Sequence, residues 1–79
     1  SALYFNKSDM TIWVIYDKSD LLSVYDAQSF EVLCEYKIPG EEQEGLFIFN
    51  GEVFIAEDQR SSIYKFNLQN LNPKGKCSF

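Results

Sequence analysis

Apolar residues in this chain gather in short runs that are separated by polar, turn-forming clusters. The runs predict strands at residues 2–5, 11–16, 21–25, 30–38, 46–49, 53–56 and 63–68. Within residues 30–38 apolar and polar positions alternate, which is typical of a strand with one face in water. Residues 12–15 contain no polar position, so we expect that strand to be covered on both faces.

This pattern occurs twice along the chain: the segment that begins at residue 53 repeats the pattern of the segment that begins at residue 12, 41 residues earlier. IWVIYD at 12–17 and LSVYD at 22–26 correspond to VFIAED at 53–58 and IYKFN at 63–67. A repeat of roughly 40 residues built from short strands is typical of a β-propeller blade. Since a blade cannot bury both of its faces alone, the repeat also predicts neighbouring sheets.

We therefore predict an all-β fold made of four-stranded antiparallel meanders of the propeller type, about 1.75 blades in all. Residues 1–38 form the first blade, 39–45 the loop between blades, and 46–79 a second, incomplete blade. Only residues 77–79 remain to begin its fourth strand. The alternative is a small β-sandwich or barrel that has residues 12–15 as its core.

Some positions carry sharper expectations. Asn50-Gly51 lies between two apolar runs and predicts a two-residue hairpin, because both residues tolerate a positive φ. Trp13 and its repeat counterpart Phe54 are expected to be buried between stacked sheets. We expect the other Phe and Tyr residues to lie in the core as well, because aromatic side chains bury a large apolar area.

Composition excludes several classes of function. The net charge of −5 and the pI near 4.5 argue against a surface that binds nucleic-acid phosphates. No apolar run approaches the ~20 residues that span a bilayer. The chain has no histidine, which removes His-based nucleophile arrangements and His-based metal sites. Its four glycines are spaced as turn residues rather than as a phosphate-binding loop.

The two cysteines, Cys34 and Cys77, lack the CxxC spacing of a zinc or dithiol motif. The simplest interpretation of Cys34 is a small buried apolar group on its strand. A Cys34–Cys77 disulfide is the alternative. It requires an oxidising compartment and a tail that returns to that strand.

The two passes of the repeat resemble the SdiA-regulated family of bacterial β-propellers. SALYF at 1–5, IWVIYD at 12–17 and LLSVYD at 21–26 look like one blade, and the joint IPG at 38–40 leads into the next. NHL-repeat and gluconolactonase-like propellers share the pattern more loosely. Such proteins close a ring of several blades, so the resemblance implies that this chain is a fragment or an oligomerising unit. It also implies a bacterial protein, in the periplasm or at the cell surface.

The resemblance to gluconolactonase-like propellers singles out Glu44. There, the residue before the Gly that opens an innermost strand points into a central channel and helps to bind a divalent cation. Glu44-Gly45-Leu46 is similar to that motif, and Ser1 would occupy the equivalent place one blade earlier. The implied cofactor is calcium, which collects oxygen ligands from several chain segments. The competing interpretation places Glu44 in a solvated acidic loop with residues 41–43.

Asp17 and Asp58 end the matched second strands. We favour turn formation for both, through side chains that bond to nearby backbone N–H groups. A shared ligand or rim role is the alternative.

Two functional hypotheses follow from these observations. The first, which we favour, is a non-enzymatic binding or scaffold segment of the SdiA-regulated type. The second is a fragment of a metal-dependent lactonase or esterase-like hydrolase with Glu44 as one ligand. The expected partners are further copies of the chain or the remaining blades of a longer propeller. The simplest closed form is a threefold ring of two-blade units.

Overall fold

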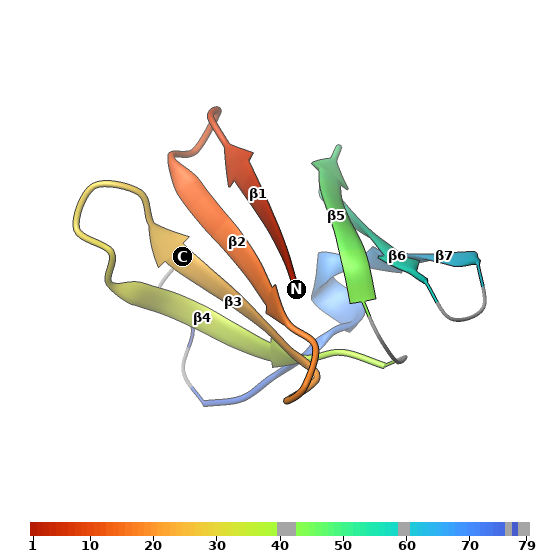
Figure 1. The fold of residues 1–79 in the computed structure, drawn as a ribbon. Helices are drawn as coiled ribbons and strands as arrows, with labels where there is room; N and C mark the ends of the chain where they lie inside the picture. Colours follow the sequence, from red (N-terminus) through yellow and green to blue (C-terminus); the bar gives the residue numbers. More distant parts are fainter. Residues whose placement is uncertain (40–42, 59–60, 76, 78–79) are drawn as a thin grey trace.

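The structure is a computed structural model that describes residues 1–39, 43–58, 61–75 and 77. It consists of two antiparallel sheets that stand side by side and diverge from a shared base (Figure 1). The first sheet contains β1 (Ala2–Asn6), β2 (Thr11–Tyr16), β3 (Leu21–Asp26), β4 (Val32–Lys37) and the short β8 (Asn72–Pro73). The second contains β5 (Gln43–Phe49), β6 (Glu52–Glu57) and β7 (Ser62–Asn67), followed by the 3-10 turn η1 (Leu68–Asn70).

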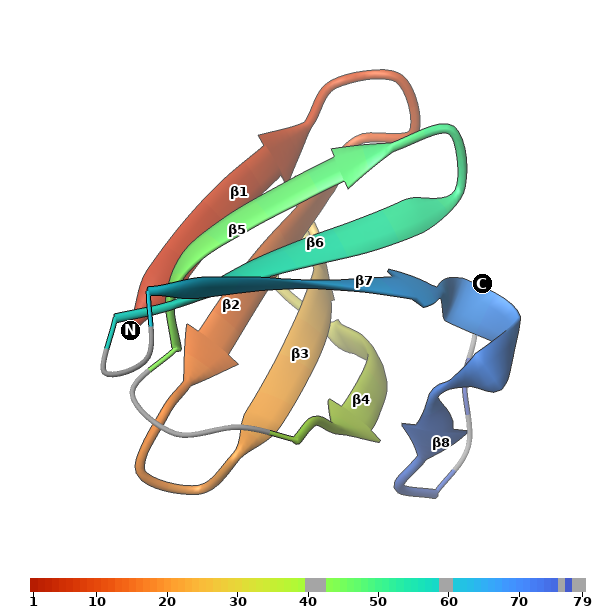
Figure 2. The same cartoon turned by 90° about the vertical axis from the view of Figure 1, so that its right-hand side faces the viewer.

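The all-β prediction is confirmed, and each predicted strand is present. In each sheet consecutive strands pair as a meander, in the order β1-β2-β3-β4 and β5-β6-β7. The two first strands, β1 and β5, run alongside each other where the sheets meet (Figure 2). The part of the chain that the structure describes has no helix long and apolar enough to cross a membrane.

The sequence repeat is also visible in the backbone conformation of the turns. Asn50 and Gly51 have φ values of 50° and 75°, so the predicted two-residue hairpin between β5 and β6 is confirmed. Asp20 and Ser61, 41 residues apart, both adopt a positive φ, of 52° and 50°. Their N–H groups donate to the carbonyls of Asp17 and Asp58 respectively. The last residues of the β2–β3 and β6–β7 connections therefore share the same φ region and the same hydrogen bond.

Two predicted boundaries are wrong. The strand expected at 30–38 is confined to Val32–Lys37, because Phe30 adopts a φ of 61° and belongs to the preceding turn. The strand expected to begin at residue 46 begins at Gln43, so Glu44 and Gly45 lie in β5 rather than in the loop assigned to 39–45. The side chain of Gln43 is buried, and hydrogen bonds from its Nε2 group stabilise this polar start.

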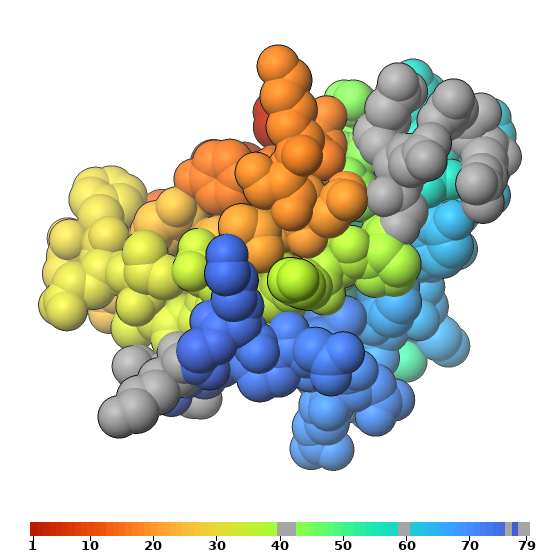
Figure 3. Space-filling view, turned by 90° about the horizontal axis from the view of Figure 1, so that it is seen from below, coloured from red at the N-terminus to blue at the C-terminus, as the bar shows by residue number. Residues whose placement is uncertain are grey.

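The C-terminal segment does not extend the second sheet as predicted. Asn72 and Pro73 of β8 instead pair with Lys37 and Tyr36 of β4. Seen from below, this segment (blue) lies against β4 (yellow-green) and the end of the second sheet (light blue) (Figure 3). Residues 78–79, the remainder of the predicted fourth strand, lie outside the described residues.

The two sheets pack through unlike faces. Trp13 and Val24 are cross-strand partners in the first sheet, and Phe54 and Lys65 are partners in the second, so positions 41 residues apart correspond. The first sheet buries the face that carries Trp13. The second buries the face opposite Phe54, on which Ile55 lies. This head-to-tail arrangement leaves one largely apolar face uncovered on each sheet.

The burial of Trp13 is therefore confirmed, at 1% exposed, whereas Phe54 is only half-buried. The general expectation that aromatic residues form the core is wrong for several positions, because they lie on faces or turns that the described residues leave uncovered. The exposed aromatic residues are Phe5, Tyr16, Phe30, Phe47 and Phe49.

Replacing Trp13 by Ala is expected to lower the free energy of unfolding by about 3–5 kcal/mol, because a large side chain leaves the core between the sheets. Phe54→Ala is the matched control and should have a smaller effect, since Phe54 lies on an uncovered face. Urea unfolding followed by far-UV circular dichroism measures both variants. Equal losses for the two would contradict the unlike-face packing.

Candidate functional site

Glu44, the predicted metal ligand, is an exposed residue of β5. It follows the buried Gln43 at an irregularity in the pairing with β6. Ser1, expected at the equivalent place one blade earlier, is exposed, and its ammonium nitrogen lies 3.2 Å from a carboxylate oxygen of Asp17. Among the described residues no three His, Cys, Asp or Glu side chains come together as a metal-binding group. Calcium binding by Glu44 stays a prediction.

Asp17 and Asp58 occupy equivalent turns, where each backbone carbonyl accepts the hydrogen bond described above. The pKa of Asp17 is lowered, chiefly by the hydrogen bond from the Ser1 ammonium group. A carboxylate-to-backbone turn of the kind expected at Asp17 and Asp58 is found at Asp26. Its Oδ1 accepts from the N–H groups of Gln28 and Ser29 at 2.8 and 3.0 Å. These two bonds lower the pKa of the Asp26 carboxyl.

The structure also brings together buried polar groups that the sequence did not reveal. Gln43 and Glu57 are cross-strand neighbours at one end of the second sheet, and both are almost fully buried. The Gln43 Nε2 group donates to a carboxylate oxygen of Asp20 at 3.2 Å and to the carbonyl of Pro39 at 3.1 Å. The Tyr64 hydroxyl donates to Glu57 at 3.4 Å. This cluster ties the second sheet to the loop that follows β2 and to the end of the first sheet.

A disulfide joins Cys34 on β4 to Cys77 in the C-terminal segment. The simplest interpretation of the sequence, an unpaired Cys34, is therefore wrong, although its sulfur is buried as expected. The pairing of β8 with β4 brings the tail back across the first sheet, which is the condition that the alternative required. The bond and β8 together hold the C-terminal segment over the junction of the two sheets.

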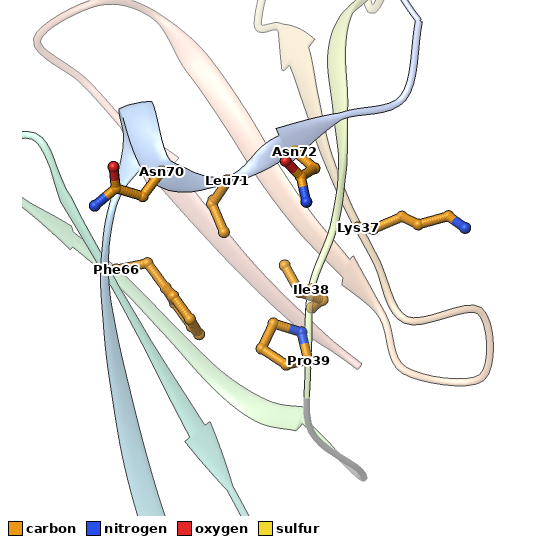
Figure 4. A pocket seen from close by; sticks show the side chains of 7 residues that line it. All are labelled: Lys37, Ile38, Pro39, Phe66, Asn70, Leu71 and Asn72. Atoms are coloured by element: carbon orange, nitrogen blue, oxygen red, sulfur yellow. The ribbon is translucent and has the colours of Figure 1, made fainter.

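Beneath that segment lies a hollow of about 410 Å³, the junction hollow (Figure 4). Phe66, Leu71, Ile38 and Pro39 face one another across it, and Lys37 extends away from it. The remaining lining residues are Asn70 and Asn72. Apart from Lys37, the lining side chains are apolar or neutral amides. The junction hollow can therefore hold apolar groups.

Each sheet has an outer face of exposed or half-buried apolar side chains that the described residues leave uncovered. The first outer face, on the β1–β4 sheet, comprises Leu3, Phe5, Ile12, Val14 and Tyr25. The second outer face, on the β5–β7 sheet, comprises Gly45, Phe47, Phe54, Ala56 and Ile63. Together with Leu46, the second outer face surrounds a shallow hollow of about 320 Å³, the outer-face hollow.

Comparison of the sequence with known protein families found no family that it matches, and comparisons with curated proteins and with solved structures found no significant similarity. Functional inference therefore depends on the residues and on the geometry described above.

Removing the disulfide with Cys77→Ser should lower the free energy of unfolding by about 4 kcal/mol, because the bond closes a loop of 43 residues. Cys77 is exposed, so the substitution itself leaves no cavity. Urea unfolding with and without a reducing agent measures the effect. The wild-type midpoint should fall on reduction while that of Cys77→Ser stays unchanged. Two free thiols in the unreduced wild type, found by mass spectrometry after alkylation, would contradict the bond.

Proposed function

We propose that this chain is a non-enzymatic binding or scaffold segment of a β-propeller of the SdiA-regulated type. In this role the two sheets are successive blades, and the chain acts by packing against sheets on either side of it. The observation that carries the proposal is the unlike-face contact between two equivalent sheets. It supports blade stacking because each blade of a propeller presents one face to the blade before it and the opposite face to the blade after it.

The two outer faces support the same conclusion. Soluble proteins rarely leave large apolar areas uncovered unless those areas bind something. Here Leu3 is 68% exposed and Ile63 is 73% exposed, each on a strand at the margin of its sheet. A sheet on each side would cover both residues, and would also cover the half-buried Phe54 and Val14.

The hydrolase alternative lacks a comparable observation. A calcium site needs six to eight oxygens, and Glu44 is an exposed carboxylate without a group of further acidic ligands in the described part of the chain. The disulfide supports the extracytoplasmic location that the family resemblance implies, because such bonds persist in oxidising compartments.

Millimolar calcium is expected to leave the melting temperature of the wild-type protein unchanged, since ligands raise it only when they bind the native state. The comparison is made with Glu44→Ala, by differential scanning fluorimetry with and without calcium. A calcium-dependent rise that disappears in Glu44→Ala would favour the metal-dependent alternative over the scaffold role.

The outer faces themselves are tested with a neutral apolar dye such as Nile red at low protein concentration. The folded wild-type protein should enhance its fluorescence, and the double substitution Leu3→Ser/Ile63→Ser should remove most of that signal. Met10→Ser is the matched control, because Met10 is an exposed apolar residue in the β1–β2 turn, outside both outer faces. A signal that the double substitution leaves intact would refute the proposed binding role of these faces.

A further inference from the structure

We propose that the two outer faces are complementary to each other, so that the first outer face of one copy of the chain docks on the second outer face of the next copy. The inference rests on the proposed scaffold role and names its partner. The contact would repeat, between copies, the packing that already joins the two sheets within one chain.

The second outer face corresponds to a face that is already covered. Phe54 and Ala56 of β6 lie at the places that Trp13 and Ile15 occupy in β2. In the first sheet these places are covered by the second sheet, and both residues are at most 1% exposed. In the second sheet the equivalent surface has no cover among the described residues. The second outer face is therefore equivalent to the covered face of the first sheet, but no sheet packs on it among the described residues.

The first outer face is equivalent to the covered face of the second sheet, which is the other side of the internal contact. Leu3 pairs with Val14 in the first sheet, as Leu46 pairs with Ile55 in the second. Leu46 packs against the core between the sheets, whereas Leu3 is exposed to solvent. The same holds for Phe5, which is 47% exposed and corresponds to Ile48 on the covered face.

The two outer faces differ in the size of some equivalent side chains. The outer-face hollow exists because Gly45 and Ala56 stand where the first sheet has Ala2 and Ile15. Backbone and side chain approach closely there, since a Cβ at Gly45 would lie 3.0 Å from the Cβ of Ala56. On the opposing face a larger residue, Phe5, replaces the aliphatic side chain of the internal contact. Smaller residues on one face and a larger one on the other suit close packing.

A contact between two different faces leaves one free face on each end of a pair. Such head-to-tail contacts form a ring when the rotation closes and a filament when it does not. A threefold ring would place six sheets around one axis, which lies within the range of blade numbers that propellers adopt.

The test uses two single-face variants of the full chain, Leu3→Lys and Ile63→Lys, with Met10→Lys as the matched control. Sedimentation velocity over a range of concentrations is measured for each protein alone and for an equal mixture of the two variants. Circular dichroism checks that each variant is folded, and Leu3→Ser and Ile63→Ser repeat the test without added charge.

Wild type and Met10→Lys should associate with increasing concentration, and each face variant alone should associate at least tenfold more weakly. The mixture should form a dimer and nothing larger, because each variant contributes the face that the other lacks. A wild-type chain that stays monomeric would overturn docking between copies, even if the dye binds the outer faces. A face variant that associates as well as the wild type would overturn the head-to-tail pairing.

Discussion

The packing of one sheet's face against the opposite face of an equivalent sheet is the contact on which the rest of this structure depends. Trp13 and Ile15 from the first sheet belong to one buried core cluster with Val53 and Ile55 from the second, and these four side chains are at most 1% exposed. Because burial of apolar area is the dominant favourable term in folding, this interface holds the two meanders together. A small chain has little other core, so the interface decides its stability.

The same contact explains why the surface is so apolar. Two equivalent sheets that pack through unlike faces bury only half of their four faces. Because residues 12–15 and 53–56 are apolar on both faces of their strands, the faces left outside are apolar as well. Here the uncovered faces carry Leu3, Phe5, Phe54 and Ile63, which links the proposed scaffold role directly to the way the sheets are joined.

Polar groups and the disulfide complete the junction where apolar packing ends. Gln43 bonds to the Pro39 carbonyl and to Asp20, so the second sheet is tied to the first by hydrogen bonds as well as by burial. On the other side the Cys34–Cys77 bond and β8 hold the tail over the junction hollow. These cross-links restrict how the sheets can move relative to each other, which suits a segment that presents two faces at a set angle.

The sequence by itself determined the approximate positions of the strands and the Asn50-Gly51 turn, because these depend on neighbours a few residues away, and the repeat can be read from it directly. Local patterns predicted these elements: the alternation in 30–38, the apolar run at 12–15 and the Asn50-Gly51 pair. Only the tertiary structure decided which face of each sheet is covered, that the tail returns to β4, and that Gln43 is buried. A strand that is apolar on both faces does not specify its partner, and long-range contacts make that choice.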